Sequence, residues 1–139
     1  MQALGGQMAK LESLLIIDDN ERCVEFLSLA FQSRGGFEVL TETRSIMALD
    51  RIRVEKPDLV VLDIKMPDID GFSVLTLLRG EGNPVPVVMC SGSARQQDVD
   101  RAYASGCNGY VAKPASLDDY RNMASAIVDY WGRSELPRH

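Results

Sequence analysis

The chain has 139 residues, of which 45% are hydrophobic and 25% charged, and its formal net charge is −5. This length accommodates one globular domain with a single core and leaves no room for a second. The acidic balance argues against binding to nucleic-acid backbones or anionic lipid, and no apolar run approaches the roughly 18 residues that span a bilayer. We therefore expect a cytoplasmic protein without nucleic-acid or membrane contacts, whose cysteines, Cys23, Cys90 and Cys107, are reduced thiols in the core.

Short apolar runs alternate with segments of helical period. The runs predict five strands, in chain order at residues 14–17, around Val39, and at residues 59–62, 85–90 and 110–112. Apolar residues at three- and four-residue spacing predict helices between them, with Val24, Leu27 and Phe31 in the first interval, Ala48 and Ile52 in the second, and Val99, Ala102 and Tyr103 in the fourth. After Ser116 and Asp119, which resemble a capping box, the last helix carries Leu117, Tyr120, Ala124, Ile127 and Trp131 on one side.

This alternation of strands and helices predicts the architecture. Short connections between strand and helix imply a parallel sheet covered on both faces, and the near-continuous apolar third and fourth runs fit strands that are buried on both sides. We expect a doubly wound α/β domain. Residues 1–12 are expected to form a flexible leader and residues 132–139 a short tail after the last helix.

Polar residues follow the predicted strands at the points where the strands end. Asp18 and Asp19 come after the first strand, Asp63 after the third, Ser91 after the fourth, and Lys113 with Pro114 after the fifth. In open parallel sheets the carboxyl ends of the strands form the ligand-binding edge. The spacing therefore predicts that these side chains converge on one crevice.

Three carboxylates in one crevice repel one another unless a positive charge neutralises them. The candidate ligands are all oxygens, and the single histidine, His139, is terminal, so a hard divalent ion such as Mg²⁺ fits better than Zn²⁺. A carboxylate beside such an ion can attack a phosphoryl group if a cation and a hydroxyl stabilise the transferring oxygens. Lys113 supplies the cation and Ser91 the hydroxyl.

The motifs LLIIDDN, PDLVVLDIKMPDIDGFSVL, VPVVMCSGS and GYVAKP, within residues 13–131, resemble the response-regulator receiver family. The resemblance implies a flavodoxin-like (βα)5 receiver domain over 13–131 with strand order 2-1-3-4-5. It also implies a signalling phosphoacceptor of a two-component phosphorelay rather than an enzyme, with Mg²⁺-dependent self-phosphorylation and self-dephosphorylation. A sensor histidine kinase or phosphotransfer protein would be the donor, a protein effector would be the target, and no output domain is expected after residue 131.

The resemblance also implies a role for each site residue. Asp63 would be the phosphoacceptor, with Asp19, Asp63 and the backbone carbonyl of Lys65 holding Mg²⁺ and Asp18 assisting through water. Ser91 and Lys113 would contact the phosphoryl oxygens. Tyr110 matches a switch aromatic that turns inward when the Ser91 hydroxyl moves, and the bond between Lys113 and Pro114 would be cis.

Three positions of the site region depart from the commonest pattern of the family or border the phosphoryl group. Ser91 stands where threonine is commoner, which keeps the hydroxyl. Lys65 and Ser93, each two residues after a site residue, border the phosphoryl group, and we hypothesise that Lys65 alters the lifetime of the phosphorylated state.

The C-terminal AIVDYW…LP segment resembles short regulators paired with phytochrome-type or other sensor kinases. Such relatives often dimerise, so we expect a homodimer through the fourth helix, fifth strand and fifth helix, using Tyr120, Ile127 and Trp131.

Other interpretations remain open at this stage. Taken singly, Asp18, Asp19 and Asp63 are ordinary turn or helix-capping residues, Ser91 a turn hydroxyl and Lys113 a surface charge, and only their joint occurrence favours a site. A Mg²⁺-dependent phosphohydrolase also uses an aspartate nucleophile, but its nucleophile lies on the first strand. A receiver that has lost phosphorylation and only binds partners is the third reading, against which the complete residue set argues.

Overall fold

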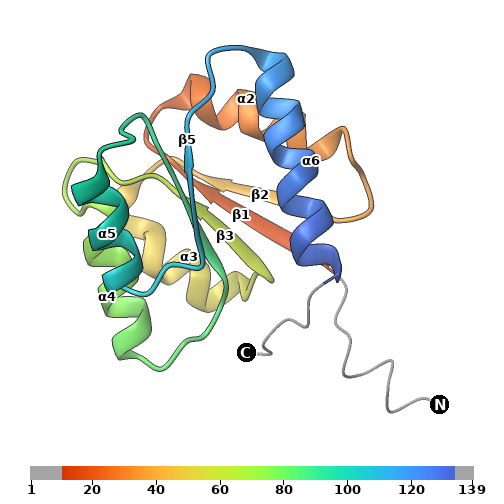
Figure 1. Cartoon of the computed structure of the whole chain (residues 1–139). Helices are drawn as coiled ribbons and strands as arrows, with labels where there is room; N and C mark the ends of the chain where they lie inside the picture. Colours follow the sequence, from red (N-terminus) through yellow and green to blue (C-terminus); the bar gives the residue numbers. More distant parts are fainter. Residues whose placement is uncertain (1–10, 134–139) are drawn as a thin grey trace.

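Five parallel strands alternate with helices in the computed structural model, which describes residues 11–133 (Figure 1). In chain order the elements are β1 (Ser13–Ile17), α2 (Glu21–Gln32), β2 (Glu38–Glu42), the 3-10 helix η1 (Ser45–Met47), α3 (Ala48–Glu55), β3 (Leu59–Leu62), α4 (Gly71–Gly80), β4 (Val87–Ser91), α5 (Gln96–Ala104), β5 (Gly109–Ala112) and α6 (Leu117–Arg133). The sheet order is β2-β1-β3-β4-β5, which confirms the predicted fold class and strand order.

The fourth strand differs from its prediction at the N-terminal end. It begins at Val87 rather than at Val85, and it includes Ser91. Pro84 and Pro86 precede it, and proline lacks the amide hydrogen that a ladder needs. Only the carbonyl of Pro86 joins the sheet, accepting from the amide of Val60 at 2.9 Å.

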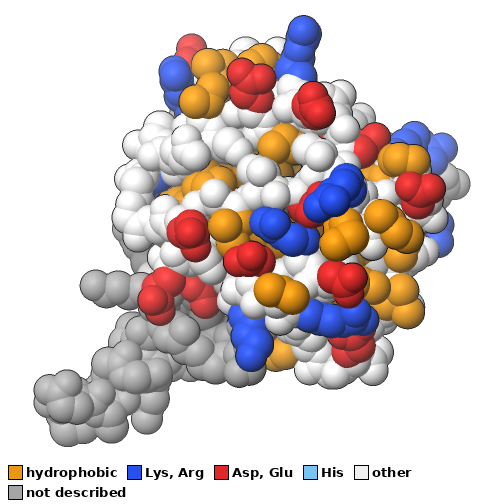
Figure 2. All heavy atoms as spheres, turned by 180° about the vertical axis from the view of Figure 1, so that it is seen from behind, with side chains coloured by type: hydrophobic (Ala, Val, Ile, Leu, Met, Phe, Trp, Pro, Cys, Tyr) orange, Lys and Arg blue, Asp and Glu red, His pale blue; other side chains and the backbone are white. Residues whose placement is uncertain are grey.

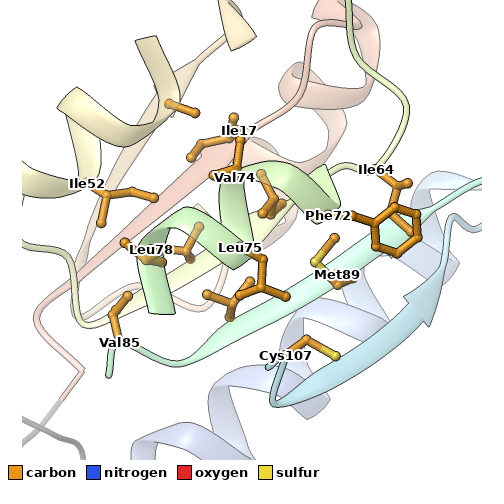
Figure 3. Packing of buried hydrophobic residues seen from close by; sticks show 14 of the residues in the cluster. Ile17, Ile52, Ile64, Phe72, Val74, Leu75, Leu78, Val85, Met89 and Cys107 are labelled. Atoms are coloured by element: carbon orange, nitrogen blue, oxygen red, sulfur yellow. The ribbon is translucent and has the colours of Figure 1, made fainter. Parts of the chain in front are cut away.

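Apolar side chains of the strands alternate between two cores, one on each face of the sheet. Leu14 and Ile16 of β1 face the cluster that α2 and α6 cover, whereas Leu15 and Ile17 face the cluster under α3, α4 and α5. Figure 1 shows these two layers, and Figure 3 shows Leu75 of α4 in the second cluster. Each fully buried side chain of this size contributes about 1.5–3 kcal/mol to folding.

The ends of the described segment overlap the predicted leader and tail. Leu11 is buried in the cluster under α2 and α6, and α6 continues to Arg133. Residues 1–10 and 134–139, including Leu136 and Pro137, lie outside the described residues, so the domain boundaries at 13 and 131 stay predictions. Within residues 11–133, no helix is both long and apolar enough to cross a bilayer.

Charged side chains of both signs share the surface. On the face seen in Figure 2, Lys and Arg side chains are interspersed with Asp and Glu. Arg53, for example, pairs with both Asp50 and Glu81. All three cysteines are free, as expected, although Cys23 is only half-buried while Cys90 and Cys107 lie in the core.

Candidate functional site

The polar residues predicted to converge do meet at the carboxyl edge of the sheet. They surround a pocket of about 450 Å³, which is lined by Asp19, Asn20, Asp63, Lys65, Ser91, Gly92, Ser93 and Lys113. Asp18 does not line the pocket; its side chain is buried beside it, 2% exposed, and contacts Lys113. Residues from four strand ends therefore share one site.

Three carboxylates of this site approach one another closely. One oxygen each from Asp18, Asp19 and Asp63 lie within 4.8 Å of one another, and Asp18 and Asp63 are buried. Burial and, to a smaller extent, the charge of Asp18 raise the pKa of Asp63, and Lys113 lowers it; the pKa that results is about 6. An all-oxygen donor set with excess negative charge is the kind of site that a hard divalent cation occupies, so these residues fit Mg²⁺.

Lys113 neutralises part of this charge. Its Nζ lies 2.9 Å from Asp18 Oδ2 and 3.3 Å from Asp63 Oδ1. Burial lowers the pKa of Lys113, but the hydrogen bond to Asp18 and the charges of both carboxylates outweigh burial and raise it above the ordinary value. The side chain is therefore an ammonium ion at neutral pH, in contact with the carboxylates of Asp18 and Asp63.

A close backbone contact fixes the main chain at Asp63. The Asp63 amide donates to the Ile17 carbonyl at 2.9 Å, and the amide of Gly71 donates to the Ile64 carbonyl at 2.7 Å. A Cβ atom at position 71 would lie 2.2 Å from the Asp63 carbonyl oxygen. Only glycine fits at this contact, so the first residue of α4 holds the segment that follows Asp63.

Ser91 and Tyr110 are connected through Ser93. The Ser93 amide donates to Ser91 Oγ at 3.1 Å, and the Tyr110 hydroxyl donates to the Ser93 carbonyl at 2.6 Å. Tyr110 is half-buried and packs against the core under α3, α4 and α5. The predicted switch residue thus lies outside the pocket but shares a bonding partner with it.

The peptide bond between Lys113 and Pro114 is trans, like every other peptide bond of the described residues. The expectation of a cis bond is wrong for this structure. The trans form is also the one that bonds preceding proline ordinarily favour, by about 0.5–1 kcal/mol.

Asn20 and Gly92 line the pocket, although sequence reasoning did not single them out. The Asn20 side chain is the N-cap of α2, where its Oδ1 accepts from the amides of Arg22 and Cys23. Its own amide donates to Asp18 Oδ1 at 2.9 Å. An asparagine directly after an aspartate pair and before a helical pattern was the available signal, since asparagine is a preferred N-cap.

Residues 14–125 match the model of the response regulator receiver domain. The chain belongs to this family. It is 31% identical over 125 residues to the alkaline phosphatase synthesis transcriptional regulatory protein PhoP of Bacillus subtilis, covering 90% of this chain and 50% of PhoP. The receiver thus spans only half the length of that relative.

Solved structures of receivers resemble this one closely. The phosphorylated cyanobacterial phytochrome response regulator RcpA superimposes with a TM-score of 0.83 at 26% identity, covering 93% of this chain and 99% of RcpA. The Mn²⁺-bound form of response regulator Rcp1 has the same fold, with a TM-score of 0.80 at 23% identity and coverage of 91% and 99%. Receivers are signalling domains of two-component systems that generally accept a phosphoryl group and bind Mg²⁺ at an acidic pocket.

Proposed function

We propose that this receiver takes a phosphoryl group onto Asp63 from a sensor histidine kinase or a phosphotransfer protein. The observation that carries the proposal is the position of Asp63, a buried carboxylate 3.3 Å from the Lys113 ammonium in a pocket that Ser91 also lines. A phosphohydrolase is disfavoured because the acceptor follows β3 and the whole pocket fits the receiver pattern. The output is a change in protein contacts.

Asp19, Asp63 and the backbone carbonyl of Lys65 would hold Mg²⁺, with Asp18 assisting through water. The bound ion would neutralise charge on the transferring phosphoryl oxygens. The proximity of the three carboxylates supports this assignment, because a bound cation relieves their repulsion at neutral pH. Asp18 is already paired with Lys113, which fits a supporting position.

The chain's own residues supply the rest of the chemistry. A carboxylate oxygen of Asp63 forms a bond to phosphorus while the bond from phosphorus to the donor's imidazole nitrogen breaks, and the imidazole leaves with the electron pair. Lys113 and the Ser91 hydroxyl contact the phosphoryl oxygens and stabilise their charge. Attack of water later releases phosphate and restores the carboxylate, which is the self-dephosphorylation expected of a receiver.

Phosphorylation would shift the face formed by α5, β5 and α6 between two states. Support comes from the contacts of Ser93 with Ser91 and Tyr110, which join the pocket to β5. Movement of the Ser91 hydroxyl toward a phosphoryl group would disturb the segment that holds the Tyr110 hydroxyl. The aromatic ring would then change its position on that face.

The same face offers a surface for an effector or a second copy of the chain. It contains a groove of about 300 Å³ whose lining includes Tyr103, Tyr110, Tyr130 and Trp131. Tyr103 and Tyr130 are 52% and 64% exposed. We propose these residues as homodimer contacts, together with Ile127, which was expected there and lines the same groove although it is only 7% exposed. Tyr120, expected among them, is only 4% exposed and packs against Phe26 inside the chain, so it is not available. Sedimentation as a monomer with and without beryllofluoride would remove the dimer.

The acidic balance and the interspersed surface charges of Figure 2 support proteins, rather than nucleic acid or membrane, as the partners. Incubation with Mg²⁺ and acetyl phosphate, followed by intact-mass measurement, tests the acceptor. Wild type should gain the mass of one phosphoryl group, and Asp63→Asn should gain none. If the wild type gains no mass, the receiver is not phosphorylated and the proposal is wrong. If Asp63→Asn gains the same mass as wild type, the acceptor is another residue.

A further inference from the structure

Ser93 makes four hydrogen bonds that connect the pocket to β5 and α5. Two are made by its backbone, with Ser91 Oγ and the Tyr110 hydroxyl, as described above. The other two are made by its hydroxyl, which accepts from the Arg95 amide at 3.3 Å and donates to Asp98 Oδ2 at 2.6 Å. The bond to Asp98 is short and involves a charged acceptor, which makes it the strong one of the pair.

Asp98 lies in the first turn of α5 and does not itself line the pocket. Its side chain is 15% exposed, and Arg95 Nε lies 3.4 Å from the oxygen that Ser93 contacts. The Ser93 hydrogen bond lowers the pKa of Asp98, and the charges of Arg95 and Lys65 lower it further against the effect of burial. The carboxylate is therefore ionised at neutral pH and remains an acceptor.

The bonds of Ser93 determine what the Ser91 hydroxyl can do. A hydroxyl has one hydrogen to donate and lone pairs that accept. Because the Ser93 amide occupies an acceptor position of Ser91 Oγ, the Ser91 hydrogen stays available for a phosphoryl oxygen. Gly92 separates the two serines and gives the segment backbone freedom, so an anchor at Ser93 is needed to keep this geometry.

We propose that Asp98 is a positioning residue for phosphoryl transfer: by holding the Ser93 hydroxyl it fixes the segment 91–93, and with it the Ser91 hydroxyl and the partner of Tyr110. This inference rests on the proposed function and extends the site to α5. A purely structural role is the alternative, since an acidic residue in the first turn also stabilises the helix through its dipole. If Asp98 is a positioning residue, removal of its bond to Ser93 slows phosphorylation. If its role is purely structural, removal lowers only the stability.

A double-mutant cycle tests the bond. The initial rate of phosphorylation by acetyl phosphate with Mg²⁺ is measured for wild type, Asp98→Ala, Ser93→Ala and the double variant. We expect each single variant to be slower by about three- to tenfold, the size that loss of one hydrogen bond gives. The double variant should be no slower than either single one, because both remove the same contact. Effects that multiply would overturn the proposal.

Two further variants separate the hydrogen bond from the charge. Asp98→Asn keeps an acceptor oxygen for Ser93 and loses the charge, so we expect a rate within about twofold of wild type. A rate as slow as that of Asp98→Ala would assign the effect to charge and overturn the proposal. Asp100→Ala removes the same charge from the same helix, where Asp100 contacts Gln96 at 2.7 Å instead, and should match wild type.

Trp131 gives a readout that a structural role would not change. It is the only tryptophan of the chain and lines the same groove as Tyr110. Saturating beryllofluoride with Mg²⁺ should shift its fluorescence in wild type, and this shift should be largely lost in Asp98→Ala. An unchanged shift with a lower unfolding temperature would leave Asp98 a structural residue and overturn the proposal.

The failure of this inference is distinguishable from failure of the proposed function. If wild type takes up no phosphoryl group, the proposed function fails and the inference fails with it. If wild type is phosphorylated and Asp98→Ala reacts at the same rate, only the inference fails. Circular dichroism checks that each variant folds, and if Asp98→Ala does not fold, Ser93→Ala and Asp98→Asn alone decide: the first must be slow and the second near wild type.

Discussion

Two buried aspartates stand at opposite ends of β3, and their surroundings differ. Asp58, directly before the strand, is 6% exposed, and its Oδ2 accepts from the amides of Glu12 at 2.8 Å and Ser13 at 3.1 Å. Asp63, directly after it, is 5% exposed and faces Asp18 and Lys113. The two carboxylates are therefore equally buried but differ in their partners. Amide donors stabilise the charge of Asp58, whereas burial and a second carboxylate raise the pKa of Asp63, a pattern that is common at functional sites.

Removal of the scaffold carboxylate should have the largest effect on stability. Asp58→Ala leaves the partly buried amides of Glu12 and Ser13 without this acceptor, and we expect a loss of about 2–4 kcal/mol in the free energy of unfolding. Urea denaturation without metal measures it. Phosphorylation of the folded fraction should continue, because Asp58 is at the far end of β3 from the pocket. A loss below about 0.5 kcal/mol would show that Asp58 does not stabilise the fold, and the contrast with Asp63 would not hold.

Asp63→Asn should raise the free energy of unfolding, in contrast to Asp58→Ala, when it is measured in the same way. In metal-free buffer at pH 7.5 we expect this variant to be more stable than wild type by about 1–3 kcal/mol, since it removes a charge that burial and Asp18 disfavour. Added Mg²⁺ should narrow this stability difference, because the proposed site of the wild type would bind the ion. If Asp63→Asn were less stable than wild type under these conditions, the negative charge of Asp63 would not be unfavourable in the folded protein, and this interpretation of the pocket would be wrong.

The pH dependence sharpens this comparison. Burial and the neighbouring Asp18 raise the pKa of Asp63 to about 6 in the folded protein, whereas an unfolded aspartate has a pKa of about 3.9. The folded state binds more protons between these values, so the contribution of Asp63 is complete below about pH 4 and lost as pH rises through about 6.

The measured quantity is the stability difference between wild type and Asp63→Asn in metal-free buffer. Wild type should lose about 1–3 kcal/mol relative to the variant between about pH 4 and pH 7. Subtraction cancels other groups such as Glu42, whose pKa burial raises but Arg44 and Arg51 lower overall, giving a contribution lost at low pH. A difference independent of pH would exclude the raised pKa.

The smallest expected effect concerns two exposed lysines, of which Lys56 comes two residues before Asp58 and Lys65 two residues after Asp63. Lys65 lines the pocket, and Lys56 ends α3 before β3. We expect Lys65→Ala to change the dephosphorylation rate by about two- to fivefold, because the side chain borders the path of water to the phosphoryl group. Lys56→Ala is the matched control and should keep the wild-type rate. Equal rates for all three proteins would end the hypothesis about Lys65.

Sequence reasoning predicted the fold and most of the site because both depend on patterns along the chain. Apolar runs locate strands, and a parallel sheet brings their carboxyl ends together, so Asp63 and Lys113 could be paired in advance. The special role of Asp58 could not be predicted, because its partners are the amides of Glu12 and Ser13, distant along the chain. Periodicity placed Tyr120 on the apolar side of the last helix, and only the resemblance to dimeric regulators assigned it to an interface; its burial depends on the packing of α6 against α2.

Asn20 joins the pocket rim to the first turn of α2, because its side chain caps the helix and its amide bonds to Asp18. Binding of a cation or phosphoryl group in the acidic pocket should therefore slow hydrogen–deuterium exchange at the amides of Arg22 and Cys23. The rate of local unfolding at the N-terminus of α2 therefore reports whether the pocket is occupied, and it can be measured without a label at the pocket.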